Sequence, residues 1–385
     1  MQRAPAIAHP LISHSEPLDG VTLKDFRILA SETTQASDIH VPPDYFVCED
    51  CLTELDDPQN RRYRYPFINC TQCGPRYTLI EALPYDRANT SMASFELCPE
   101  CLKEYSDIAN RRFHAEPVAC GRCGPQLLFS QAGHEITDNQ AALAACVTAL
   151  REGQVVAVKG VGGYHLMCNA ADPATVQRLR AHKRRPHKPL ALMFPLSDGL
   201  AALSRVVTLS AEETALLRTP GRPIVLATQK TGNGRPQGIA PGLGEVGVML
   251  PYSPLHHLLL NDFGGPLVAT SANISGEPVL TERTSVEKSL AAVAEAFLHH
   301  DRPIVRPADD SVYRSLSGKP RPLRLGRGHA PAELELPFAL KQPVLALGGQ
   351  TKNTVCLAWG ERAVVSPHIG EMGSARSLEV FEQLI

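Results

Sequence analysis

Apolar and polar positions alternate with helix and strand periods in the chain from about residue 138 onward. Residues 141–150 (AALAACVTAL) are small and apolar helix formers followed by Gly153, which predicts a helix that ends there. The apolar run 155–158 (VVAV) predicts a buried strand. Further buried strands are predicted at 190–193, 223–227, 246–250 and 267–270. Strands that alternate with helices indicate a mixed or parallel sheet with a cleft at the strand ends.

Capping residues and prolines mark where the intervening helices begin and end. An Asp-Pro pair at 172–173 predicts a helix through about residue 182, and a Ser-Pro pair at 253–254 predicts another. The capping box at 210–213 (SAEE) predicts a helix that must end by Pro220. Residues 286–299 are expected to form a longer amphipathic helix.

Three polar clusters follow these apolar elements. They are HKRRPHKP at 182–189, TSANISG at 270–276, and the segment 306–328, which contains RPADDSVYR and LRLGRG. The first cluster suits an anion cradle, and it suits equally well a solvated helix end that complements the helix dipole. The second offers hydroxyls and an amide for hydrogen bonds to a ligand. The GVGG at 160–163 is weak alone, and the sequence holds no Walker loop.

Eight of the 11 cysteines form four C-x-x-C pairs. Eighteen residues lie between the two pairs of each set, and the whole pattern repeats after 50 residues together with NRR and GP. This spacing is typical of a tetrahedral four-cysteine zinc site, so the sequence predicts two structural zinc ions. Each unit can close on itself, which we prefer, or the pairs can interleave. The ligands are Cys48, Cys51, Cys70, Cys73, Cys98, Cys101, Cys120 and Cys123.

Composition changes this picture little. The 385 residues suffice for two or three domains, and the formal net charge of -2 gives no general attraction to nucleic acid or lipid. The longest uncharged stretch, 246–261, is interrupted by prolines and histidines, so no membrane span is expected. The first residues resemble no secretory signal, which predicts the cytoplasm. The remaining thiols, Cys146, Cys168 and Cys356, fit buried small hydrophobes.

The order KRRPHKP, SANISG and a late Arg-rich strand resembles the YrdC family, whose members form carbamoyl-type adenylates from ATP in an open cavity. With the cysteine doublet upstream, the chain resembles more specifically the HypF family of hydrogenase-maturation carbamoyltransferases, from about Pro42 to the end. That resemblance implies flanking acylphosphatase-like and ASKHA-type domains. The chain holds only the last strand of the first, at 21–31, and an initial hairpin of the second, which carries Gly348, Gly349, Lys352 and Asn353.

The resemblance also implies a chemistry and a set of residues. Carbamate from carbamoyl phosphate would attack ATP, with Mg²⁺, to give carbamoyl adenylate for the C-terminal cysteine of the partner protein HypE. His165 fits a packed core histidine equally well. The catalytic assignments are Lys183, Arg184, Lys188, Ser271 and Asn273. The nucleotide-binding assignments are Lys159, Gly162, Gly163, His165, Asp310, Ser311, Arg324 and Arg327.

The expected fold class is α/β (α+β) and multidomain. The expected divisions are a remnant at 1–41, tandem zinc fingers at 42–135, a YrdC-like domain with an open cavity at 136–335, and the start of an ASKHA-type domain at 336–385. Two alternative functions remain open. One is threonylcarbamoyl-adenylate synthesis for tRNA modification. The other is a zinc-stabilised module that binds protein or RNA, although the charge balance makes nucleic acid an unfavourable partner.

Overall fold

The computed structural model describes residues 41–196, 199–230, 236–273 and 276–385. The remnant strand expected at 21–31 lies outside these residues. Among the described residues, no helix combines the length and the apolar character that crossing a bilayer requires.

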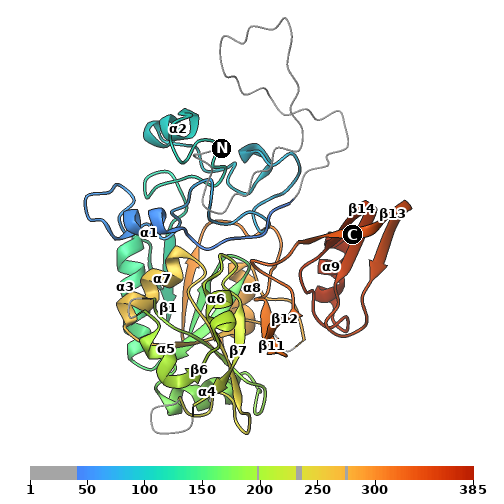
Figure 1. The fold of residues 1–385 in the computed structure, drawn as a ribbon. Coiled ribbons are helices and arrows are strands. Elements are labelled where there is room, and N and C mark those ends of the chain that lie inside the picture. The colour runs from blue at the N-terminus through green and yellow to red at the C-terminus, as the bar shows by residue number, and fades with distance from the viewer. Residues whose placement is uncertain (1–40, 197–198, 231–235, 274–275) are drawn as a thin grey trace, which may run out of the picture.

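Two similar cysteine units lie at one end of the molecule, at the top of Figure 1. We call residues 44–93 the first cysteine unit and residues 94–126 the second. Each contains a short helix, α1 (Glu49–Asp56) or α2 (Pro99–Ser106), which begins immediately after the first cysteine of its unit. A 3₁₀ turn, η1 (Arg87–Asn89), lies in the first unit, between the two helices in sequence.

A mixed sheet forms the centre of the molecule (Figure 1). The order of its hydrogen-bonded strands is β12-β11-β7-β8-β5-β9-β4-β3-β10-β1-β2, with β6 beside β7. The pairs β3/β10, β5/β8 and β7/β11 are parallel, so the expected mixed sheet is confirmed. The strands are β1 (Leu127–Gln131), β2 (His134–Ile136), β3 (Val156–Lys159), β4 (Tyr164–Asn169), β5 (Ala191–Met193), β6 (Val207–Thr208), β7 (Ile224–Gln229), β8 (Glu245–Met249), β9 (Leu267–Ser271), β10 (Ala296–His300), β11 (Val312–Leu316) and β12 (Lys319–Arg324).

Alternate residues of 155–158, at the start of β3 and just before it, separate two apolar cores, one on each face of the sheet. Val156 and Val158 pack in a cluster with α3, α7 and the first cysteine unit, whereas Val155 and Ala157 pack in a cluster with α4, α5, α6 and α8. The first cysteine unit therefore shares a core with the sheet. The helices are α3 (Asn139–Arg151), α4 (Pro173–His182), α5 (Ala201–Val206), α6 (Ala211–Arg218), α7 (Pro254–Phe263) and α8 (Arg283–Leu290).

The long helix expected at 286–299 is wrong. Helix α8 ends at Leu290, and residues 296–300 form β10 instead. The segment is rich in alanine, glutamate and leucine, which favour helix. However, Ala296 to Leu298 pair in parallel with β3, and strand β10 as a whole is largely buried. Burial in the sheet overrides the local helix preference. The capping box at Ser210 and the Asp172 and Ser253 caps are confirmed.

A hairpin and a helix complete the chain. Strands β13 (Ala332–Leu347) and β14 (Val355–Val365) pair in an antiparallel sheet of their own, and α9 (Ala375–Leu384) follows. The expected hairpin is thus present. It projects to one side of the main sheet (Figure 1), and several of its large apolar side chains are exposed.

Candidate functional site

Each cysteine unit closes on its own four thiols. The four sulfurs of each set lie within 4.8 Å of one another. In the first unit, Cys48 and Cys70 Sγ are 3.7 Å apart, as are Cys51 and Cys73 Sγ. Four sulfurs about 2.3 Å from a central zinc would stand about 3.8 Å apart, so the geometry fits tetrahedral zinc. The preferred pairing is confirmed and the interleaved one is excluded. With all four positions filled by thiolates, these sites are structural.

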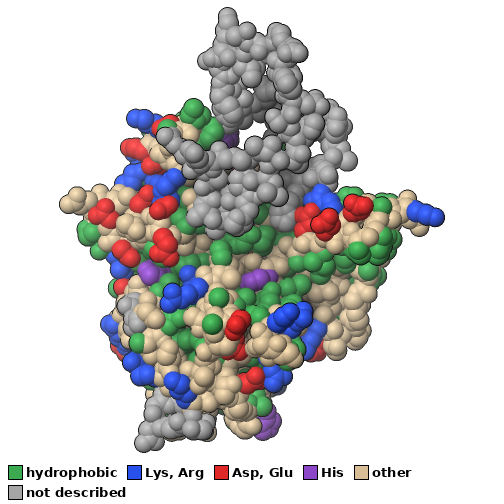
Figure 2. Space-filling model, in the orientation of Figure 1, with side chains coloured by type: hydrophobic (Ala, Val, Ile, Leu, Met, Phe, Trp, Pro, Cys, Tyr) green, Lys and Arg blue, Asp and Glu red, His purple; other side chains and the backbone are tan. Residues whose placement is uncertain are grey.

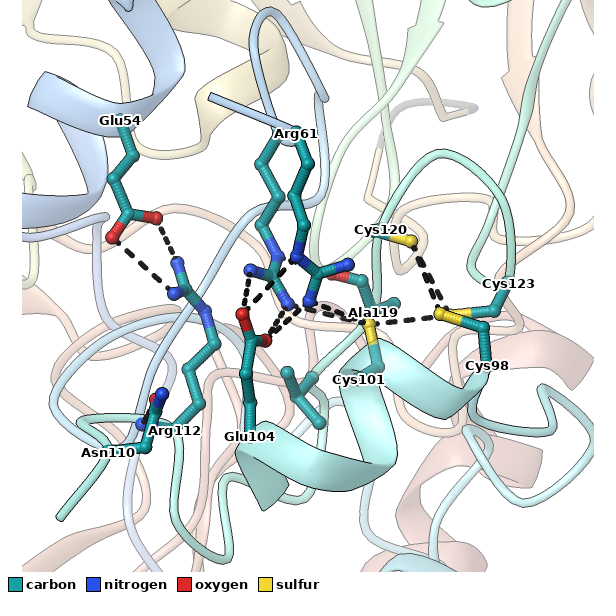
Figure 3. A network of polar contacts seen from close by, with 12 residues as sticks. Glu54, Arg61, Cys98, Cys101, Glu104, Asn110, Arg112, Ala119, Cys120 and Cys123 are labelled. Carbon is teal, nitrogen blue, oxygen red and sulfur yellow. Dashed lines mark hydrogen bonds and ion pairs between the residues drawn. The ribbon is translucent and has the colours of Figure 1, made fainter. Parts of the chain in front are cut away.

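The two units exchange arginines (Figure 3). Arg61 and Arg62 of the first unit both bind Glu104 of the second, with Nη2 to Oε2 distances of 2.5 Å, and reach Cys101 Sγ at 3.3 and 3.4 Å. Although burial opposes the charged form, these bonds hold the pKa of Glu104 at about 2. Each arginine therefore supports the other unit's thiolate site.

The reverse exchange is built the same way. Arg111 and Arg112 of the second unit bind Glu54 of the first, and Arg111 Nη1 lies 3.2 Å from Cys51 Sγ. A zinc ion with four thiolates carries a net charge of about -2, which the donated guanidinium groups offset. The repeated NRR motif thus has a physical role that the sequence alone did not reveal.

A second cluster lies where α4 and β9 end. Lys183 caps α4, and its Nζ donates to the backbone oxygen of Ser271 and to Asn273 O and Oδ1 at 3.2 and 3.3 Å. Ser271 Oγ donates to Asn273 Oδ1 at 2.9 Å. Burial, together with the charges of Arg185 and Lys188, lowers the pKa of Lys183 to about 7. The structure therefore brings together three of the five residues assigned as catalytic.

More charges surround this lysine. Arg185 donates to Thr270 Oγ1 at 3.0 Å, and Arg324 binds Asp309 Oδ2 at 2.6 Å. Lys188 is exposed, but its partial desolvation, followed by the charges of Arg185 and Arg324, lowers its pKa, whereas Asp309 acts in the opposite direction. Arg185 and Asp309 lie within the clusters identified in the sequence but were not assigned roles. The cluster is basic, and Asp309 is the acid that balances part of it.

A buried polar chain lies beside the lysine cluster. His165 on β4 lies directly opposite Ser271 on β9. Its Nε2 lies 2.7 Å from Asp310 Oδ2, and its Nδ1 lies 2.9 Å from the Tyr252 hydroxyl. Arg327 donates twice to Asp310 Oδ1, at 3.0 and 2.9 Å. Although burial opposes the charge, His165 and Arg327 hold the pKa of Asp310 well below its usual range.

Gly162, Gly163 and Ser311, three residues assigned to nucleotide binding, are all buried. Gly162 and Gly163 lie with His165, Tyr252 and Asp310 around a void too small to hold one water. A Cβ at Gly162 would lie 2.3 Å from Ala308 O, so only glycine fits there. Ser311 is fully buried, accepts from Gly326 N and donates to Arg327 O, so it joins two chain segments. Tyr252 was missed, because it lies between the strand predicted at 246–250 and the helix start predicted at Ser253, and no local pattern marks it.

Two assigned residues lie apart from Lys183. Arg184 has a φ of 51° at the end of α4 and lines a separate open depression of about 810 Å³ with Gln177 and Gly238. Lys159 points into a cavity at the junction with the first cysteine unit, where its Nζ donates to His300 O and Arg302 O, both at 3.1 Å. The structure does not bring either side chain to Ser271 or Asn273.

The C-terminal segment packs against the loop that carries the lysine cluster. Glu371 N donates to Gly276 O at 2.9 Å, and Arg376 Nη2 donates to Val279 O at 3.0 Å. His368 N donates to Leu325 O at 2.8 Å. The segment after β14 therefore closes one side of the candidate site.

Two closed four-thiolate sites beside this sheet and its lysine, serine and asparagine cluster define a zinc-binding protein with a YrdC-like domain of the adenylate-forming class. Comparison with known families agrees. The family described as "Telomere recombination", which groups Sua5, YciO and YrdC, matches residues 148–326. The HypF finger matches residues 47–80 and 97–129, and the HypF Kae1-like domain matches residues 339–385.

Individual relatives point the same way. The carbamoyltransferase HypF of Synechocystis is 48% identical over 382 residues, covering 99% of this chain and 49% of that protein. A crystal structure of full-length HypF in a phosphate- and nucleotide-bound form superposes with a TM-score of 0.83 at 44% identity, over 89% of this chain and 44% of that one. The T. kodakarensis HypF structure gives 0.85 at 40% identity, over 90% and 45%. The chain belongs to the HypF family and spans about half the length of these relatives.

A more distant relative matches a shorter part of the chain. The threonylcarbamoyl-AMP synthase of Alkalilimnicola ehrlichii is 33% identical over 150 residues, which is 39% of this chain and 77% of that protein. That match does not extend over the cysteine units and the C-terminal hairpin together.

Proposed function

We propose that the chain carries out the ATP-dependent step of a carbamoyltransferase in [NiFe]-hydrogenase maturation, the formation of carbamoyl adenylate. The observation that carries the proposal is the partly buried lysine that is held against Ser271 and Asn273 at the strand ends. Lys183 is held over Ser271 and Asn273 with Arg185, Lys188 and Arg324 close by. Such a cluster of donors is suited to a polyphosphate and to the charge that develops during transfer of a nucleotidyl group.

The residues divide the reaction between them. A carbamate oxygen attacks the α-phosphorus, the bond from that phosphorus to the bridging oxygen breaks, and pyrophosphate leaves with the bonding electrons. Lys183 and Lys188 stabilise the phosphate charge. The Ser271 hydroxyl donates a hydrogen bond to Asn273 Oδ1, so its oxygen can still accept a hydrogen bond from the carbamoyl amino group. Asn273 is itself fixed by Glu277 O at 2.5 Å.

The remaining assignments belong to the same proposal. His165, Asp310 and Arg327 form the buried polar chain beside the lysine cluster, and Gly162 and Gly163 let their segment pack closely against Ala308 and Val279. Mg²⁺ would bind with the phosphates and balance their charge. The acceptor of the carbamoyl group is HypE. Zinc sites built of free thiolates suit a reducing compartment, which supports the cytoplasm.

The RNA-binding alternative finds little support on the surface. On the face in Figure 2, basic and acidic side chains are interspersed and form no broad basic field. In the cysteine units, Arg61, Arg62, Arg111 and Arg112 are engaged with glutamates. Their charge is therefore largely neutralised within the protein.

Calorimetry of the zinc-loaded chain with MgATP tests the site. Loss of one charge-assisted hydrogen bond to a phosphate costs about 1.5 to 3 kcal/mol, so Lys183→Met should weaken binding by roughly 10- to 100-fold. Ser271→Ala should weaken carbamoyl adenylate formation more than it weakens ATP binding. The exposed Lys288 on α8 provides the control, and Lys288→Met should bind like the parent chain. Equal affinity in the parent chain and Lys183→Met would refute the assignment.

Pyrophosphate release tests the reaction. Ammonium carbamate with MgATP should release pyrophosphate, because carbamate is the substrate of the proposed step. No release with carbamate would contradict the proposal. Release that requires threonine and hydrogencarbonate would instead favour the activity named for the A. ehrlichii relative.

A further inference from the structure

The segment 301–310, which joins β10 to β11, is anchored on the first cysteine unit. Val305 N donates to the Thr78 carbonyl at 2.9 Å. The Arg306 guanidinium donates to the Ile80 carbonyl. Neighbouring residues of the segment therefore bind alternate residues of the cysteine unit, one through the backbone and one through a charged side chain. Together the two bonds fix both the position and the direction of the segment at this point.

The anchor itself belongs to a buried hydrogen-bond network of the cysteine unit. Thr78 is fully buried, and Asp44 Oδ1 accepts hydrogen bonds from Thr78 N and Oγ1 at 3.2 and 2.8 Å and from Arg76 N at 2.7 Å. Arg76 Nη2 in turn donates to the carbonyls of Cys70 and Thr71, at 3.2 and 3.0 Å. Cys70 is one of the four thiols of the first zinc site. The anchor is thus continuous with the turn that carries a zinc ligand.

The other end of the segment lies in the candidate site. Pro307 directly follows Arg306, and its ring fixes the backbone φ angle, so the chain has little freedom between the anchor and the site. Asp309 Oδ2 accepts from Arg324 Nη1 at 2.6 Å, and Asp310 O accepts from Arg324 Nε at 2.7 Å. The two aspartates therefore orient the guanidinium of Arg324, one of the residues assigned to the nucleotide.

Arg306 connects these two ends. Its guanidinium carbon also lies 5.7 Å from the centre of the Tyr77 ring, on the cysteine unit. We propose that Arg306 is a positioning residue for the candidate site. By anchoring the segment on the first cysteine unit, it holds the two aspartates where they orient the Arg324 guanidinium. The effect on ATP affinity rests on the proposed function, whereas the order of the segment does not.

Amide hydrogen exchange of the zinc-loaded chain tests the anchoring without a ligand. In Arg306→Met, the amides of Ala308 and Arg327, both hydrogen-bonded where the segment meets the sheet domain, should exchange about 10-fold faster. The amides of the central strands β5 and β8 should keep their rates. Arg64→Met is the matched control, because Arg64 also joins the first cysteine unit to the sheet domain, but through Asp262 on α7.

Calorimetry with MgATP tests the consequence for the site. Loosening of the segment should weaken ATP binding about 3- to 10-fold in Arg306→Met. Arg306→Lys keeps a charged donor for the Ile80 carbonyl, so it should recover most of the affinity and of the amide protection. Arg64→Met should bind ATP like the parent chain. A general defect of the junction would instead weaken both methionine variants, and lysine would not relieve it.

Each outcome decides the proposal. Unchanged amide exchange in Arg306→Met, equal acceleration in Arg64→Met, or faster exchange with unchanged ATP affinity would overturn it. If Arg306→Met holds fewer than two zinc ions, Ser91→Ala replaces it and should show the same pattern, because Ser91 Oγ donates to Pro303 O of the segment at 3.2 Å. If the parent chain did not bind ATP but the exchange rates changed as expected, the proposed function alone would fail.

Discussion

The exchange of arginines between the cysteine units makes an unusual prediction about zinc. Arg62 belongs to the first unit, yet its guanidinium binds Glu104, Ala119 O and Cys101 Sγ of the second. Replacing Arg62 by methionine keeps most of the side-chain volume and removes these bonds. The variant should therefore weaken zinc in the second site and leave the first, whose cysteines belong to the mutated unit, nearly unchanged.

The magnitude follows from the burial of the pair. Arg62 is 1% exposed and Glu104 is 20% exposed. Removing one partner of a buried pair costs about 3 to 5 kcal/mol, and the lower end applies because Arg61 still reaches Glu104. A loss of about 3 kcal/mol that falls on the metal corresponds to roughly 100-fold in affinity.

Cadmium-113 NMR of the protein with cadmium in place of zinc separates the two metal sites. In Arg62→Met, the resonance of the second site should shift and disappear first when a chelator is added. The companion variant Arg111→Met should do the opposite, because Arg111 reaches Cys51 and Glu54 of the first unit. If each variant instead loosened the site of its own unit, or both sites equally, the reasoning would be refuted.

Three further predictions concern other parts of the chain. Because the folded pKa of Lys183 is about 7 and its usual value is 10.5, the unfolded chain binds more protons between these values, so Lys183 makes stability rise with pH across that window. Lys183→Met should flatten this rise in denaturant titrations, and ATP binding at pH 8 should take up protons, visible as a dependence of calorimetric heat on the buffer. Gly162→Ala should destabilise the fold by about 2 to 4 kcal/mol through its clash with Ala308 O, whereas Gly244→Ala, which meets nothing within 4 Å, should change stability by less than about 0.5 kcal/mol. A chelator that removes both zinc ions should unfold the cysteine units and expose the core that they share with α3 and α7, measured as increased binding of a hydrophobic dye, and unchanged dye binding would contradict that shared core.

Much of the architecture was predictable because its signals are local. The C-x-x-C spacing determined the zinc ligands, and the caps at Asp172, Ser210 and Ser253 located three helices. The helix prediction at 286–299 was wrong because the composition of the segment favours helix, whereas the burial of residues 296–300 depends on β3, more than 130 residues earlier in the chain. Pairing between distant segments has no local signature.

The candidate site shows the same division. Lys183, Ser271 and Asn273 lie in polar clusters that follow apolar runs, the family resemblance assigned their roles, and in the structure they meet. The contact of Tyr252 with His165 and the ion pair between Arg61 and Glu104 of the other cysteine unit could not be predicted. Each depends on which elements lie side by side in space. Arg184 was grouped with Lys183 because both belong to the motif that carries the family resemblance, but the positive φ at residue 184 belongs to a turn that lines another depression.

The contact between the C-terminal segment and the loop after β9 bears on how the chain can be dissected. A cut near residue 335 would fall just before the HypF Kae1-like match, which begins at residue 339, and would therefore be an obvious choice of boundary. It would nevertheless remove the donors that hold the carbonyl oxygens of Gly276 and Val279. A shortened chain would keep every residue of the lysine cluster and lose part of the clamp on its loop. Weak nucleotide binding by such a shortened chain would then result from the loss of these contacts, and it would not measure the affinity of the site when they are present.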